Sequence, residues 1–311
     1  MAFPEEIFIN EMVLRDGLQL EDKVLSVEEK VLLFSQLKEA GVNSFEFGSF
    51  VHPKLVPQMA NSGELYTEIK KDAESLSLIA LVPNLKGAER AQEVGVGQIN
   101  FVFSASDTHN MQNVNKSTLE SVQELKEINA FCSRFEIKLN VTIATSFGCP
   151  FEGDIPKSRI LLSVKQMFDF NIDTLTLADT TGIANPNQVY ELVNEVRMSF
   201  PQQKLGLHFH NTRGMGLSNI LAGIKAGVTT FDSALGGLGG CPFAPGATGN
   251  VCTEDVVHML HSMGMKTNVR LEGLLETSAL LEEVIGHKNK SYILKAGPYD
   301  RKYPVPALSS K

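Results

Sequence analysis

Residues 174–210 read TLTLADTTGIANPNQVYELVNEVRMSFPQQKLGLHFH and show the pattern on which the fold prediction rests. It contains two short, largely apolar runs, at about 174–180 and about 205–210, separated by a stretch at about 186–200 with the periodicity of a helix. An apolar strand, a helix and a second apolar strand in this order are typical of a parallel sheet covered by helices. The stretch therefore predicts one β-α-β unit.

The same pair of elements recurs along the chain. Further strand-like runs lie at about 7–14, 43–48, 77–83, 98–105, 136–145 and 229–235, with helical stretches such as 27–40 and 117–134 between them. Eight strands that alternate with helices predict an α/β fold, a closed (β/α)8 barrel rather than an open sheet.

Two more helical stretches, at about 253–264 and 271–285, follow the eighth strand. We therefore expect one barrel domain over residues 1–311, with the residues from about 265 forming a C-terminal helical extension. Two medium-sized domains are the alternative, which the absence of linkers and low-complexity segments weakens.

The composition excludes some classes of function. The 311 residues include 28 Lys and Arg against 36 Asp and Glu, a formal net charge of −8, which gives no long-range attraction to nucleic acid or to an anionic membrane surface. The four cysteines lack the C-x-x-C spacing of zinc or iron–sulfur sites. The first residues are acidic, and no apolar run approaches the roughly 20 residues of a membrane span. We expect a reduced, cytoplasmic protein.

In a (β/α)8 barrel the chemistry takes place at the carboxyl ends of the strands, and polar residues collect there in this sequence. They lie at the ends of the first, second, sixth and seventh expected strands and in the loop after the eighth. In chain order they are Arg15, Asp16, Glu46, Asp179, His208, His210, Cys241 and Asn250.

The segment His208-Phe209-His210 carries the most information. Side chains alternate along a strand, so both imidazoles lie on the same face and can point into the barrel. Asp16 follows the first strand and can converge with them. Two imidazoles with oxygen ligands suit a divalent cation such as Mn, Mg, Fe or Zn. Taken alone, the two histidines could instead be packed in the barrel core.

Three charged residues near this pair have both a structural and a functional interpretation. Arg15 and Asp16 could form a surface ion pair, but at the mouth of the barrel Arg15 offers a permanent cation for a developing oxyanion. Glu46 and Asp179 stand in strands, where a buried carboxylate has to be paired or to function. A functional role is favoured for Asp179, and Glu46 is open between the two.

Glycines dominate residues 236–242, GGLGGCP. We interpret this segment as a mobile loop, and its spacing does not fit a dinucleotide-binding fingerprint. Cys241 on such a loop could deliver or accept a proton at the site, although a lone cysteine is more often an inert apolar residue.

Several motifs together resemble the 3-hydroxy-3-methylglutaryl-CoA lyase family, part of a metal-dependent superfamily of barrel lyases and synthases. The resemblance runs from about residue 8 to 285. Its motifs are RDGLQ at 15–19, SFVxPKxVPQM at 49–59, PNLKG at 83–87, GCPFEG at 148–153, HxH at 208–210, GGLGGCP at 236–242 and GxxGN at 246–250. The glycine loop and the 49–59 segment are specific to the lyase, whereas RDG and HxH mark only the superfamily.

The resemblance implies a TIM barrel, usually dimeric, which holds Mg or Mn through Asp16, His208, His210 and Asn250. It implies a retro-Claisen cleavage of 3-hydroxy-3-methylglutaryl-CoA to acetyl-CoA and acetoacetate. In that family the substrate hydroxyl loses its proton and the C2–C3 bond breaks. By resemblance Arg15 stabilises the enolate oxygen, Cys241 protonates the carbanion, and Asp179 and Glu46 serve proton transfer and the geometry of the site.

The sequence departs from the family pattern near the pocket, at Val13-Leu14, at Asp107-Thr108-His109, and at Asn211 and Arg213. Arg213, if it faces the pocket, would bind a second carboxylate or a phosphate of CoA. A related acyl-CoA lyase, for citramalyl-CoA or a longer-branched homologue, is therefore an alternative. Two further functions stay open, a Claisen-type synthase of the isopropylmalate synthase type and a non-catalytic CoA- or metal-binding barrel.

Overall fold

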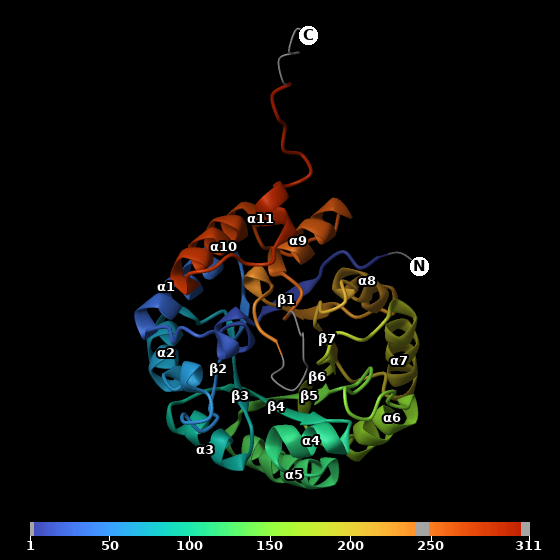
Figure 1. Ribbon diagram of the computed structural model, residues 1–311. Helices are drawn as coiled ribbons and strands as arrows, with labels where there is room; N and C mark the ends of the chain where they lie inside the picture. Colours follow the sequence, from blue (N-terminus) through green and yellow to red (C-terminus); the bar gives the residue numbers. More distant parts are fainter. Residues whose placement is uncertain (1–2, 241–248, 306–311) are drawn as a thin grey trace.

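The computed structural model describes residues 3–240 and 249–305, apart from the side chain of Asp72. Eight parallel strands close into a barrel in chain order, and helices surround it (Figure 1). The strands are β1 Phe8–Glu11, β2 Ser44–Ser49, β3 Ser77–Val82, β4 Gln98–Ser104, β5 Lys138–Ala144, β6 Ile172–Asp179, β7 Leu205–Phe209 and β8 Thr230–Ser233. The pairing of β1 with β8, from Phe8 beside Thr230 to Glu11 beside Ser233, completes the barrel.

The predicted (β/α)8 barrel with additional C-terminal helices is thereby confirmed. The helices are α1 Val27–Glu39, α2 Ser62–Ile69, α3 Leu85–Glu93, α4 Asp107–Val114, α5 Thr118–Phe135, α6 Lys157–Gln166, α7 Pro186–Ser199, α8 Gly216–Lys225, α9 Thr253–Ser262, α10 Leu271–Ile285 and α11 Tyr292–Ala296. Helices α9, α10 and α11 lie together at one side of the barrel (Figure 1). No helix in the described residues is long and apolar enough to cross a membrane.

Helix α1 shows how the sequence sets the ends of an element. Ser26 and Glu29 form the capping box that their spacing predicts, each side chain accepting from the other residue's backbone N–H. The helix ends before Gly41, which has a φ of 100°. A Cβ at Gly41 would also lie 2.3 Å from the carbonyl oxygen of Asn268. Both the positive φ and this close approach therefore require glycine.

The hydrophobic core lies between the strands and the helices. Phe101, Ile143, Leu177, Leu207 and Phe231 point outward from their strands and are fully buried or nearly so. The side chains that alternate with them point into the barrel, and many of these are polar. The barrel interior is therefore able to carry chemistry while the outer layer supplies the packing.

The first strand is shorter than its predicted range of about 7–14. It ends at Glu11, and Val13–Gly17 form a π-helical turn, η1. The Glu11 carboxylate accepts the backbone N–H of Val13 at 2.8 Å, a donor that a continued strand would have used in the sheet. Arg15 and Asp16 are consequently carried by a turn and not by a strand end.

The glycine-rich stretch begins as a fixed turn, which corrects the expectation of a loop throughout. Residues Leu235–Gly237 form a buried 3-10 turn, η5. Glu11 accepts the N–H of Leu235 at 2.9 Å, and Glu254 accepts the N–H of Gly236 at 3.1 Å. Burial raises the pKa of both Glu11 and Glu254 to about 7, because its effect is larger than that of the hydrogen bonds, which lower the pKa.

These two pKa values make a prediction about stability. Each carboxyl group has a pKa of 4.5 in the unfolded chain and about 7 in the folded protein. The folded state therefore holds the proton more tightly. This stabilises it fully below pH 4.5, and the contribution is lost as the pH rises through about 7. It amounts to about 3 kcal/mol per group at most. In the native protein the urea concentration at the midpoint of unfolding should fall between about pH 5.5 and about pH 8, and Glu254→Gln should make this fall smaller. Glu283→Gln, on an exposed part of α10, is the control, and an unchanged pH dependence in Glu254→Gln would contradict the assignment.

Candidate active site

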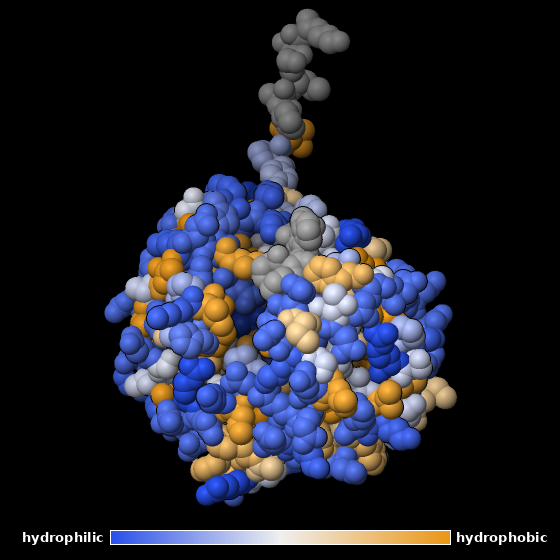
Figure 2. Space-filling view, turned by 60° about the horizontal axis from the view of Figure 1, so that its bottom comes forward, coloured by the Kyte–Doolittle hydropathy of each residue, from blue (hydrophilic) through white to orange (hydrophobic). Residues whose placement is uncertain are grey.

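A cavity of about 600 Å³ lies at the carboxyl ends of the strands. Figure 2 shows the molecule hollowed near its middle, with hydrophilic residues in the depth and hydrophobic residues beside them. The polar part of its lining includes Arg15, Asp16, Asn100, Thr142, His208, His210 and Asp232, and the apolar part includes Leu20, Val51, Leu55, Val56, Met59, Val82 and Val114. One cavity thus combines a charged floor with an apolar wall.

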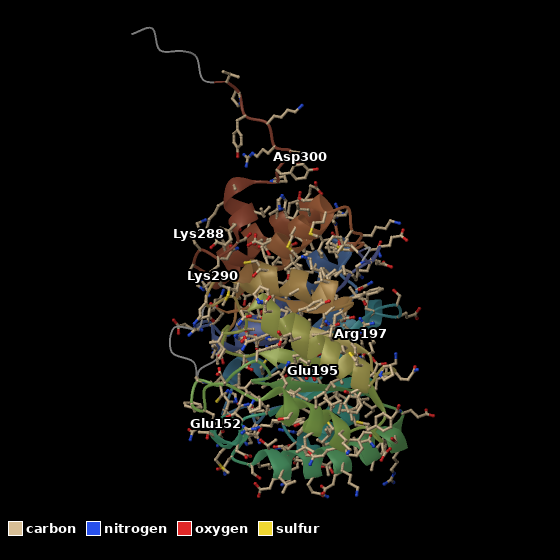
Figure 3. The ribbon with its side chains drawn as sticks, turned by 90° about the vertical axis from the view of Figure 1, so that its right-hand side faces the viewer. Glu152, Glu195, Arg197, Lys288, Lys290 and Asp300 are labelled. Atoms are coloured by element: carbon tan, nitrogen blue, oxygen red, sulfur yellow. The ribbon has the colours of Figure 1, made fainter. Side chains whose placement is uncertain are left out.

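A side view separates the two poles of the barrel. In Figure 3 one edge of the molecule carries Glu152, which follows β5, and Lys288 and Lys290, which follow α10. This edge is the face toward the viewer in Figure 1. Arg197, near the end of α7, lies away from that edge (Figure 3). The cavity opens on the pole of Glu152, where the strands end.

Arg15 is buried on the turn η1 and held by two carboxylates. Its Nε donates to Glu46 Oε1 and its Nη1 donates to Asp16 Oδ1. The other oxygen of Glu46 accepts from Asn100 Nδ2 at 2.8 Å. Burial raises the pKa of Glu46, and the charge of Arg15 offsets part of this rise. Glu46 therefore fixes the guanidinium, while Arg15 itself faces the cavity.

Asp16, His208 and His210 form a buried group, as the sequence predicts. One ligand atom from each residue lies within 4.8 Å of the others, and His210 Nε2 is 3.6 Å from Asp16 Oδ2. Both ring nitrogens of His210 are buried without a hydrogen-bond partner in the described part of the chain. An unpaired buried polar atom costs about 1–3 kcal/mol. One of them, the nitrogen that carries the lone pair of the neutral ring, is thus available to a cation.

Asn250 completes the group from the segment that follows the glycine-rich stretch. It forms a β-bridge with His210, and its Nδ2 donates to Asp16 Oδ2 and, at 3.0 Å, to the carbonyl of Leu238. Its Oδ1 is buried and has no hydrogen-bond partner within residues 3–240 and 249–305. Two imidazoles, a carboxylate and an amide oxygen form a donor set that fits a divalent cation.

The charges around this group also fit a cation. Burial alone would raise the pKa of Asp16, but Arg15 and the two histidines outweigh it and hold this pKa below its ordinary value. Asp16, Glu46 and Asp232 are three buried carboxyl groups that interact with one buried guanidinium, that of Arg15. The described cavity floor therefore carries an excess of acidic groups.

The structure does not bring Asp179 into the cavity. Its neighbours Ala178 and Thr180 line the cavity, so Asp179 points to the other face of β6. Its two carboxylate oxygens accept the backbone N–H groups of Ile183 and Ala184 at 2.9 and 3.0 Å. The geometry gives Asp179 a role in holding the segment that leads into α7, and its catalytic role stays a prediction without geometric support.

Arg213 is likewise outside the cavity lining. It is exposed, and its Nη1 donates to the carbonyls of Thr181 and Gly182, each at 3.1 Å. Asn211 accepts the N–H of Gly216 at 3.0 Å and so shapes the turn before α8. The predicted substrate-binding role of Arg213 stays a prediction, which these contacts do not favour. Cys241 lies outside the described residues.

Sequence reasoning gave no role to two titratable residues that line the cavity, Asp232 and His109. Asp232 on β8 lies 3.2 Å, oxygen to nitrogen, from His208 Nδ1. His109 on α4 lines the cavity, with its Nδ1 2.6 Å from Ser104 Oγ. Asp232 had a signal in the sequence, since an acidic residue inside the apolar run TTFDSAL is unusual for a buried strand. His109 had none beyond its departure from the family pattern.

Comparison with known proteins identifies the family. The HMGL-like family model matches residues 6–281. The chain belongs to the HMGL-like family. It is 41% identical to the hydroxymethylglutaryl-CoA lyase of Bacillus subtilis, with 92% of this chain and 95% of the relative covered. It is 37% identical to the (R)-citramalyl-CoA lyase of Chloroflexus aurantiacus, with 94% and 96% covered.

A solved structure agrees with this membership. The HMG-CoA lyase of Acinetobacter baumannii, in complex with coenzyme A and 3-methylmalate, is 42% identical and superposes with a TM-score of 0.93, covering 98% of this chain and all of the other. The predicted resemblance and the prediction of a carbon–carbon lyase are confirmed at the level of the family. HMGL-like enzymes depend on a metal, and the Asp16, His208 and His210 group could hold one.

Proposed function

We propose that this protein is a hydroxymethylglutaryl-CoA lyase, which cleaves 3-hydroxy-3-methylglutaryl-CoA to acetyl-CoA and acetoacetate. The observation that carries the proposal is one cavity lined by the buried cation Arg15 and by His210, whose ring nitrogens have no hydrogen-bond partner among the described residues. The lyases that cover nearly the whole chain favour cleavage over the condensing direction of a synthase.

The proposed site holds a divalent cation, Mg or Mn, through Asp16, His208, His210 and Asn250. When bound, such an ion lowers the pKa of a coordinated hydroxyl group and offsets negative charge. Asp16 is suited to this because its pKa is held low, so the carboxylate stays ionised. Oxygen ligands combined with imidazole are compatible with Mg and Mn as well as with other divalent ions.

Cleavage of the C2–C3 bond produces a negative charge that Arg15 can stabilise. The C3 hydroxyl gives its proton to a base, for which Glu46 is the proposed acceptor. The electron pair of the O–H bond forms the new C=O bond, and the C2–C3 pair moves to C2 as the enolate of the thioester. A proton then adds to C2, for which Cys241 is the proposed donor. An enolate is stabilised by a fixed positive charge that is already in place, and Glu46 and Asp16 hold the guanidinium of Arg15 in position.

The apolar wall gives the cavity room for the less polar part of an acyl-CoA thioester. We propose an acyl-CoA thioester as the substrate and a homodimer as the assembly. A cytoplasmic location and a single domain over residues 1–311 also stay predictions.

The purified protein tests the proposal directly. With Mn²⁺ or Mg²⁺, it should release acetyl-CoA from 3-hydroxy-3-methylglutaryl-CoA with a higher kcat/KM than any other thioester in a panel that includes citramalyl-CoA and longer-branched homologues. A higher kcat/KM for citramalyl-CoA, with release of acetyl-CoA and pyruvate, would favour the alternative lyase. No cleavage of any member of the panel would contradict a lyase function.

Arg15 provides a second prediction. Losing a preorganised charge that acts on the transition state typically costs about 10²–10³ in kcat, or roughly 3–4 kcal/mol. Arg15→Gln should therefore lower kcat by that factor with a small change in KM. Arg197→Gln, on α7 away from the cavity, is the control and should retain the native kcat. A large rise in KM at native kcat would instead make Arg15 an anchor for a substrate carboxylate.

A further inference from the structure

Asp232 occupies a place between two other polar residues at one level of the barrel. It pairs in register with Asn10 on β1 and with His208 on β7. It lines the cavity, and its side chain is 11% exposed. Three neighbouring strands therefore present Asn10, Asp232 and His208 side by side.

Both oxygens of Asp232 are engaged. Oδ1 accepts from Asn10 Nδ2 at 2.9 Å, and Oδ2 lies 3.2 Å from His208 Nδ1. The amide of Asn10 is itself oriented, because its Oδ1 accepts from Ser44 Oγ at 2.9 Å. A chain of contacts thus runs from Ser44 on β2 through Asn10 and Asp232 to His208.

This chain decides which nitrogen of His208 carries the proton. An ionised carboxylate only accepts hydrogen bonds, so the ring nitrogen that faces it must donate. With Nδ1 protonated, Nε2 holds the lone pair of the neutral ring. His210 differs, since neither of its ring nitrogens has a hydrogen-bond partner among the described residues.

We propose that Asp232 is a positioning residue, which fixes the tautomer and ring orientation of His208 so that Nε2 is presented to the cation. The inference rests on the proposed metal site. A partner on the second nitrogen of a ligating histidine typically changes metal affinity by about 10–100-fold. The affinity of the site for its cation should therefore depend on Asp232 although Asp232 itself is not assigned as a ligand.

Two variants of Asp232 test this. Asp232→Leu removes the acceptor and should weaken Mn²⁺ binding by about 10–100-fold. Asp232→Asn can keep an acceptor, because the amide of Asn10 can turn over and donate to the hydroxyl of Ser44. We therefore expect Asp232→Asn to bind Mn²⁺ more weakly than the native protein but more tightly than Asp232→Leu.

The measurement is the dissociation constant of Mn²⁺ from electron paramagnetic resonance, with the His208 tautomer from ¹⁵N NMR as a readout independent of turnover. Thr174→Val, a change inside the same barrel but outside the cavity lining, is the control and should leave both unchanged. Native affinity and an unchanged tautomer in both Asp232 variants would overturn the inference and leave the lyase function standing. Absence of Mn²⁺ binding to the native protein would overturn the metal site and this inference together.

Discussion

The guanidinium of Arg15, buried between the carboxylates of Glu46 and Asp16, is the contact on which the rest of the site depends. A buried charge is costly unless it is paired and hydrogen-bonded. Glu46 and Asp16 meet that requirement, and Asn100 in turn orients Glu46. The second carboxylate, Asp16, also faces the two histidines, so the arrangement that stabilises Arg15 places an acidic ligand beside them.

Glu11 links this ion pair to the remainder of the site. Its carboxylate accepts from Val13, at the start of η1, and from Leu235, at the start of η5. A third contact comes from the hydroxyl of Thr253 at 2.7 Å. One buried side chain therefore ends β1, shapes the turn that carries Arg15, and positions the beginning of the glycine-rich stretch.

The barrel and the closeness of the two histidines could be predicted from the sequence because both follow from local periodicity. Alternation along β7 places His208 and His210 on one face whichever way the strand is turned. Alternation does not place Asp179, because periodicity does not say which face of β6 points inward; Ala178 and Thr180 take that face, and the catalytic role of Asp179 stays a prediction. The turn at Val13–Gly17 was also not predicted, because its hydrogen bond uses a glutamate side chain, and the same Glu11 oxygen is shared with Leu235, 224 positions away.

Among the described residues, the His210 ring nitrogens and Asn250 Oδ1 have no hydrogen-bond partner, and we propose that His210 and Asn250, with Asp16 and His208, bind a divalent cation that cleavage requires. The most direct measurement is the turnover of 3-hydroxy-3-methylglutaryl-CoA by exhaustively chelated protein, before and after Mn²⁺ or Mg²⁺ is restored. We expect negligible turnover without the cation and recovery with one equivalent bound per chain. Native turnover in the chelated protein would contradict it.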